Sequence, residues 1–224
     1  PVEPKTEAVW QGLSASCQGR LEAADACLEL MRPAARSGPP GLVLLAARTA
    51  VSVDRVLTAI DWLEQARARL GDDRELSIEQ AKLLSRTGDH DGAVEVLEPL
   101  VSGDPRVLNL IGYAELLRGH TEAGAAYLER SIRQAQSLGR PYAPAHYHLG
   151  LHHLAEGELE RAREQFEAAA RANGQHLEAH YQWIGVTERL GEDPSPAREG
   201  FATINRRRLE QMGALAPSEQ AEEP

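Results

Sequence analysis

The sequence has few aromatic residues, few cysteines and no long apolar run. Aromatic side chains make up 4% of the 224 residues. No stretch alternates β-branched residues with polar ones, so strands are not expected. No run of 18 apolar residues exists, which argues against a membrane-spanning helix, and no signal peptide is visible. Because the chain begins with Pro1 and not with methionine, we expect a processed or excised piece of a longer protein.

Sequence motifs for catalysis and features for nucleic-acid binding are also missing. The GxSxG, P-loop, GxGxxG, HExxH and CxxC patterns do not occur, so we predict no enzyme and no cofactor. A net charge of -10 disfavours nucleic-acid binding, which depends on neutralising phosphates. The three arginines at 206–208 lie about 100° apart on a helix. This favours a solvated face, with contact to an acidic partner as the alternative.

The two cysteines are Cys17 and Cys27. With a turn near residues 18–20, Cys27 would lie about one helical turn beyond the residue opposite Cys17. A relaxed bridge would need the turn nearer residue 22, because bridged Cα atoms usually lie within about 7 Å. We therefore expect two buried free thiols. A bridge is the alternative and would argue for an oxidising compartment; otherwise the cytoplasm is favoured over the periplasm or the cell envelope.

Helix-forming residues dominate the chain, and one stretch shows a clear helix-pair pattern. Positions 7, 8, 15, 20, 24 and 27 of the 34-residue stretch 143–176 hold Leu149, Gly150, Gly157, Ala162, Phe166 and Ala169. Gly157 separates two helices, while Ala162 and Phe166 form a packing stripe at i, i+4 spacing. Gly150 lies on the face that the second helix approaches closely. Such a pair cannot bury its apolar face alone, so neighbouring pairs are required.

This pattern resembles a tetratricopeptide (TPR) repeat. Similar units are expected over residues 74–104, 105–142, 143–177 and 178–212, with two degenerate pairs over 6–73. The unit at 105–142 is about four residues longer, which we interpret as a helix extended by one turn. The resemblance implies an all-α, right-handed superhelical solenoid of antiparallel helix pairs with about five to six repeats in one elongated unit. Segment 1–5 and the acidic tail 213–224 are expected to be disordered.

Histidine is the one residue type whose clustering suggests metal chemistry. Six of the eight histidines lie close together in sequence: His146, His148, His152, His153, His176 and His180. His148 and His152 have the i, i+4 spacing that can place two imidazoles on one metal ion. No motif supplies a third ligand, and His146 and His153 hold repeat positions where TPR units have aromatic packing residues. We therefore predict no metal site.

The resemblance places a partner-binding groove on the concave side, formed mainly by positions 2, 5, 9 and 12 of each first helix. The predicted groove residues are Lys82, Arg106, Asn109, Tyr113, Leu116, Tyr147, His148, Leu151, Leu154 and Gln182. Their middle is apolar and aromatic and their ends are polar, which suits an extended peptide or an amphipathic helix. For the leucines, the alternative is packing between adjacent repeats.

The predicted function is a non-enzymatic protein–protein interaction scaffold or adaptor that binds a peptide or helix of a partner protein in the groove. We expect it to act within a bacterial multiprotein assembly for motility, secretion or the envelope. The alternative is a regulatory or sensory TPR region of a larger signalling protein, such as a kinase, methyltransferase or transcriptional activator. Self-association through the solenoid ends is left open, and a helix over residues 196–212 would cap one end.

Overall fold

The structure, a computed structural model, describes residues 4–71, 73–101 and 103–211. These residues form helices joined by short connections, and no strand occurs among them. None of the described helices is long and apolar enough to cross a membrane. The chain divides into two units, Pro1–His120 and Thr121–Pro224, whereas a single elongated unit was expected.

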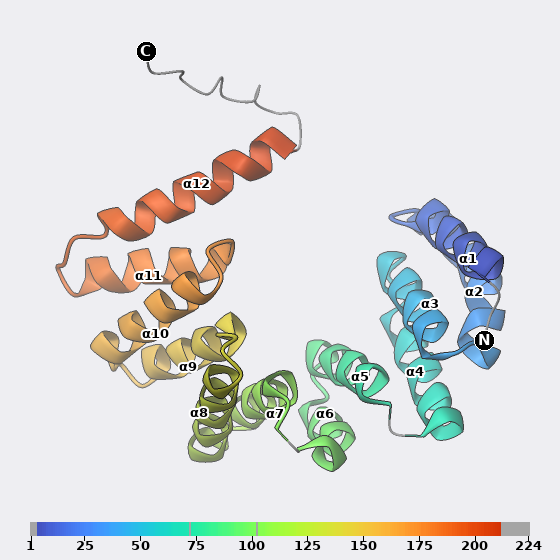
Figure 1. The fold of residues 1–224 in the computed structure, drawn as a ribbon, viewed down its shortest axis with the longest axis horizontal. Helices are drawn as coiled ribbons and strands as arrows, with labels where there is room; N and C mark the ends of the chain where they lie inside the picture. The colour runs from blue at the N-terminus through green and yellow to red at the C-terminus, as the bar shows by residue number, and fades with distance from the viewer. Residues whose placement is uncertain (1–3, 72, 102, 212–224) are drawn as a thin grey trace. The chain divides into compact units, whose positions relative to one another are not determined.

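The first unit contains seven α-helices in its described part (Figure 1). They are α1 (Pro4–Cys17), α2 (Ala24–Ser37), α3 (Pro40–Ser52), α4 (Val56–Leu70), α5 (Arg74–Thr87), α6 (His90–Leu97) and α7 (Pro105–Leu117). Two 3-10 turns, Leu21–Ala23 and Glu98–Leu100, follow α1 and α6. Helix α1 begins within the segment 1–5 that was expected to be disordered, because Pro4 starts it. The expected tail 213–224 and the end of the expected cap at Met212 lie outside the described residues.

Local sequence signals fix where these helices begin and end. The carboxylate of Asp73 accepts hydrogen bonds from two backbone N–H groups at the start of α5, and Asp104 accepts one at the start of α7, directly before Pro105. Such caps satisfy N–H groups that have no partner inside the helix. Gly88 ends α5 with φ of 90°, a left-handed conformation that glycine adopts without strain.

Small side chains form much of the core of the first unit. Ala46, Ala47 and Ala50 of α3 are fully buried together with Leu63 of α4. Alanine leaves so little side-chain bulk that neighbouring helices can pack closely, as the predicted helix pairs require. The buried Ser14 hydroxyl also forms a 2.7 Å hydrogen bond with Thr49, joining α1 to α3.

Cys17 and Cys27 form a disulfide, so the expectation of two free thiols is wrong. Their Cα atoms lie 5.8 Å apart. The 3-10 turn Leu21–Ala23 moves the reversal of the chain close to residue 22, which is the position that a relaxed bridge needs. Both cysteines are buried, next to Val53 at the end of α3.

The second unit contains five α-helices in its described part. They are α8 (Thr121–Ser137), α9 (Ala143–Ala155), α10 (Leu159–Ala172), α11 (Leu177–Arg189) and α12 (Ser195–Gln211). Helix α8 has 17 residues, in agreement with the predicted extension by about one turn. The pair α9–α10 lies within the expected repeat 143–177, and the pair α11–α12 begins at Leu177, one residue before the expected repeat 178–212.

Helices α9 and α10 pack as the repeat pattern predicts. Phe166 and Ala162 are fully buried, and a Cβ atom at Gly150 would lie 2.7 Å from Cε1 of Phe166. Only glycine fits at this position without moving the ring. The glycine thus allows α9 to contact the aromatic side chain of α10 directly.

Candidate functional site

The most apolar stretch of the predicted groove lies on α9 and α11 of the second unit. Tyr147, Leu151, Leu154 and Trp183 are half-buried and pack against a fully buried core of Ala162, Phe166 and Val186. We call the set Tyr147, His148, Leu151, Leu154, Gln182 and Trp183 the α9–α11 face. Because the buried core supports the tyrosine, the two leucines and the tryptophan, the orientation of these four side chains is restrained before any partner binds.

Tyr147 is the best restrained residue of the α9–α11 face. Its ring centroid lies 4.9 Å from that of His176, 5.7 Å from that of His148 and 5.9 Å from that of Phe166. These separations lie within the range in which tilted aromatic pairs attract each other. His176 is itself fixed, since its Nδ1 accepts a 3.2 Å hydrogen bond from the backbone N–H of Ala179 at the start of α11.

The imidazole of His148 favours the neutral form. Burial, and after it the nearby His176, lower the pKa of this ring from the ordinary 6.5 to about 4. A charged ring would lose hydration in this environment, which is why burial disfavours its protonated form. At neutral pH the α9–α11 face therefore carries an uncharged ring at this position.

We expect the second unit to lose stability in mild acid because of His148. The unfolded chain binds the proton first, at a pKa near 6.5, so the contribution of His148 is complete above that pH. It is lost as the pH falls from about 6.5 to about 4, by up to about 3 kcal/mol. Urea unfolding between pH 7.5 and 4 measures the loss. A His148→Gln variant should show a shallower pH dependence, and an identical slope would contradict this assignment.

The predicted groove residues of the first unit form a more polar surface on α5 and α7. Lys82 is exposed, with its Nζ 3.5 Å from Glu79. Asn109 is only 2% exposed, so it belongs to the packed interior more than to an open groove. Tyr113 and Leu116 are half-buried. The five predicted positions on α5 and α7 therefore differ in exposure, whereas the repeat pattern places them together in one groove.

Arg106 is engaged by carboxylates of its own chain. Its guanidinium donates to both carboxylate oxygens of Glu75, at 2.7 and 3.0 Å, and to Asp104 at 2.8 Å. The hydrogen bonds to Arg106 lower the pKa of Glu75, and they outweigh the effect of burial and lower that of Asp104 as well. The pKa of Arg106 is raised, first by Glu75 and then by Asp104. An acidic partner would have to compete with these two groups for Arg106.

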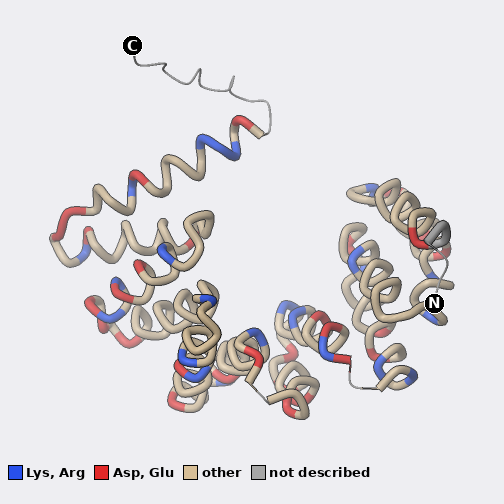
Figure 2. Tube along the Cα trace, viewed as in Figure 1, with Lys and Arg blue, Asp and Glu red and all other residues tan. Residues whose placement is uncertain are grey.

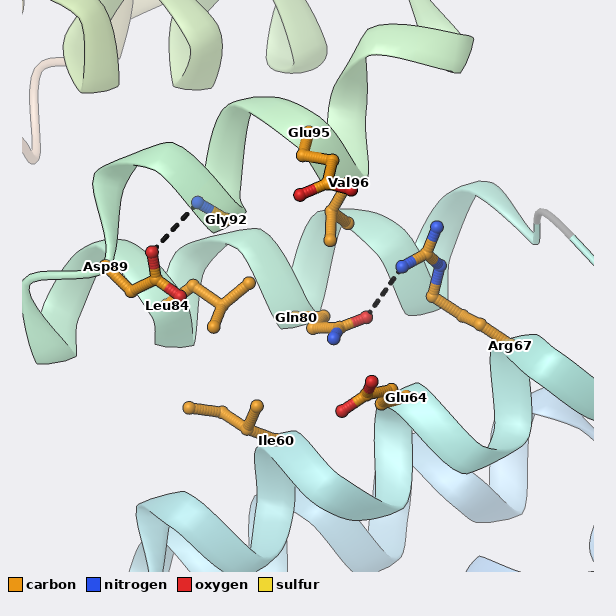
Figure 3. Close-up of a pocket in the computed structure, with 9 residues that line it drawn as sticks. All are labelled: Ile60, Glu64, Arg67, Gln80, Leu84, Asp89, Gly92, Glu95 and Val96. Atoms are coloured by element: carbon orange, nitrogen blue, oxygen red, sulfur yellow. Dashed lines mark hydrogen bonds between the residues drawn. The ribbon is translucent and has the colours of Figure 1, made fainter.

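A cavity of about 350 Å³ lies between α4, α5 and α6 (Figure 3). It is lined by Ile60, Glu64, Arg67, Gln80, Leu84, Asp89, Gly92, Glu95 and Val96. Arg67 donates a 2.9 Å hydrogen bond to Gln80, and Asp89 accepts one from the backbone of Gly92. Polar groups of the lining thus form hydrogen bonds with one another at both ends of the cavity. Within the described ranges, no three His, Cys, Asp or Glu side chains are grouped to hold a metal ion.

Two residues of the site were not among the predicted groove residues. Trp183 packs against the same buried residues as Tyr147, and the ring of His176 lies against that of Tyr147 in a tilted arrangement. Trp183 directly follows the predicted groove residue Gln182. An aromatic residue next to a groove position is the sequence signal that could have identified it. His176 precedes α11, and its contact with Tyr147 depends on how two hairpins stack, which no local pattern encodes.

No family model matches the chain, and no curated protein matches it significantly. Solved structures do match. BtubC from P. vanneervenii is 16% identical, with a TM-score of 0.62 over 92% of this chain and 95% of that chain. MamA from Desulfovibrio magneticus RS-1 is 19% identical, with a TM-score of 0.54 over 79% of this chain and 97% of that chain. Human IFIT1, solved as a dimer with m7Gppp-AAAA, is 16% identical, with a TM-score of 0.59 over 82% of this chain and 46% of that chain.

Identities below 20% show the fold and nothing about ligands. Together with the consecutive packing of the helices, these likenesses confirm that the chain has an all-α, TPR-like solenoid fold built from helix pairs.

Proposed function

We propose that this chain is a non-enzymatic scaffold or adaptor that binds an apolar, aromatic-containing segment of a partner protein on the α9–α11 face. The observation that carries the proposal is the uncharged, pre-ordered surface of α9. Tyr147 and the leucines at 151 and 154 lie on one helix that contains no Asp, Glu, Lys or Arg (Figure 2). Half-buried aromatic side chains held by a rigid core are typical binding anchors, because little side-chain entropy is lost when a partner covers them.

The distribution of charge supports an apolar partner segment. In α11 the charged residues Glu178, Glu188 and Arg189 lie toward the two ends of the helix, and its middle is uncharged. Glu188 is paired with Arg198 of α12. A partner segment on the α9–α11 face would therefore meet aromatic and aliphatic surface, with the Gln182 side chain available for hydrogen bonding.

Replacing Tyr147 by alanine should reduce partner capture by at least about tenfold, the effect of a binding anchor worth more than 1.4 kcal/mol. The measurement is a pull-down from source-cell lysate, read by mass spectrometry, with the intact chain beside Tyr147→Ala. Tyr181→Ala is the matched control, because Tyr181 is 64% exposed on α11 and lies outside the face. Tyr113→Ala tests the first unit separately. Far-UV circular dichroism should show equal helicity for all variants.

Equal capture by the intact chain and Tyr147→Ala would contradict the assignment of the α9–α11 face. Loss of capture in Tyr113→Ala alone would move the binding surface to the first unit. We propose a bacterial assembly for motility, secretion or the envelope as the setting. The identities of proteins captured by the intact chain and lost with Tyr147→Ala would test this setting directly.

A further inference from the structure

The terminal helix α12 packs on α11 differently from the way α10 packs on α9. By the repeat pattern, Gly185 and Phe201 correspond to Gly150 and Phe166. A Cβ atom at Gly185, however, would meet no atom within 4 Å, and Phe201 is only half-buried. The ring of Phe201 instead lies 6.5 Å from that of the exposed Tyr181. The predicted glycine–aromatic contact is therefore absent from this hairpin.

A histidine makes the close contact between these two helices. A Cβ atom at Gly200 of α12 would overlap the imidazole of His180 on α11, so the ring lies directly against the backbone of α12. His180 is 6% exposed. Neither of its ring nitrogens has a hydrogen bond of ordinary geometry among the described residues. The contact between α11 and α12 thus depends on a buried imidazole ring. If this ring were protonated, few neighbouring groups would compensate its positive charge.

The groups around His180 do not supply an opposite charge. His176, directly before α11, disfavours protonation of His180, whereas the backbone groups of Ala197 on α12 and of Gly174 in the turn before α11 favour it. Burial is the largest effect, and the pKa of His180 is lowered from 6.5. Three of the charged side chains near this contact are paired with other residues: Arg198 of α12 with Glu188, Arg171 of α10 with Glu167, and Glu178 of α11 with His176.

We propose that α12 is an acid-released terminal helix, held on α11 at neutral pH by the uncharged His180 ring against Gly200 and released when that ring takes up a proton. Released from α12, the ring is hydrated and binds its proton near the ordinary pKa of 6.5. Docking is therefore complete above about pH 6.5. Below it, one linked proton weakens docking by up to about tenfold per pH unit. This inference is independent of the binding function proposed above.

Hydrogen exchange of α12 peptides in the intact chain, corrected for the intrinsic pH dependence of exchange, tests the proposal. Protection of α12 should fall by about tenfold or more between pH 7.5 and pH 5.0. His180→Gln, which cannot titrate, should keep its protection within about twofold over the same range. Gly200→Ala should lose protection at both pH values, because its methyl group displaces the ring. Gly185→Ala is the matched control and should behave like the unmodified chain, since its methyl group enters open space.

Two results would overturn the proposal. One is an equal loss of α12 protection in His180→Gln and in the unmodified chain at pH 5.0. The other is equal protection in Gly200→Ala and Gly185→Ala. If α12 of the His180→Gln variant does not dock at pH 7.5, a pH titration of the His180 Cε1–H resonance by NMR, in the unmodified chain, tests the proposal instead. Protonation that coincides with loss of α12 protection supports the proposal, and protonation near pH 6.5 with α12 still protected refutes it.

Discussion

Replacing Phe166 by alanine is expected to lower the free energy of unfolding of the second unit by about 3–5 kcal/mol, the cost of emptying a fully buried aromatic site. The ring is 0% exposed and contacts both Gly150 and Tyr147. Gly150 is part of the helix backbone and cannot fill the space from its side. The cavity should therefore persist, which places this substitution among the most destabilising in the chain.

Phe201→Ala provides a matched comparison at the equivalent repeat position. Its ring is half-buried and lies away from Gly185, so truncation should cost about 1 kcal/mol. Urea unfolding followed by far-UV circular dichroism, with hydrogen exchange to localise the effect to α9 and α10, measures both variants. Equal losses at the two positions would show that the two hairpins pack alike, against the structure.

The contrast between these two phenylalanines shows what the sequence pattern can predict. In the hairpin of α9 and α10, Gly150 and Phe166 predicted the contact correctly, because the packing of a helix pair is local in sequence and follows the i, i+4 stripe. In the hairpin of α11 and α12 the same residue types recur, yet α12 presents Gly200 to α11. Gly200 is adjacent to Phe201 and lies about 100° around the helix. A pattern of small residues does not specify which of two glycine-containing faces is used when a histidine offers another contact.

The candidate site shows a similar limit. Tyr147, Leu151 and Leu154 could be placed on one helix face from their spacing, and the structure puts them on one surface supported by a common core. Glu75 and Arg106 form an ion pair and hold position 2 of two consecutive predicted repeats. A comparison of the repeats could therefore have found this pair. The ring contact of His176 with Tyr147 could not have been found in this way, because the register between hairpins depends on tertiary packing.

The disulfide was missed for a third physical reason. Whether Cys17 and Cys27 meet depends on where the chain reverses, and a shift of two or three residues in a turn moves a side chain on the following helix by most of a turn. The 3-10 turn Leu21–Ala23 sets this position. Turn boundaries are the part of a helical hairpin that residue periodicity defines least well.

Removing the Cys17–Cys27 bridge should destabilise the first hairpin by about 3 kcal/mol, the chain-entropy effect expected for a short closed loop. The cysteines are 10 positions apart. Among the described residues, α1 is also attached to the first unit by the Ser14–Thr49 hydrogen bond and by half-buried contacts of Trp10 and Leu13 with the core. Reduction should therefore release α1 selectively and leave α3 to α7 folded.

Limited proteolysis and hydrogen exchange with and without reductant measure this release. Cys17→Ser/Cys27→Ser should behave like the reduced chain in both conditions, and Ser14→Ala is the control that removes the neighbouring hydrogen bond but keeps the bridge. Equal protection of α1 in the oxidised and reduced chains would show that the bridge is not what holds this helix. Thiol labelling of the denatured, unreduced protein from its source adds a second result. Because structural disulfides persist in oxidising compartments, two protected cysteines would favour such a compartment, and two labelled cysteines would restore the free-thiol interpretation.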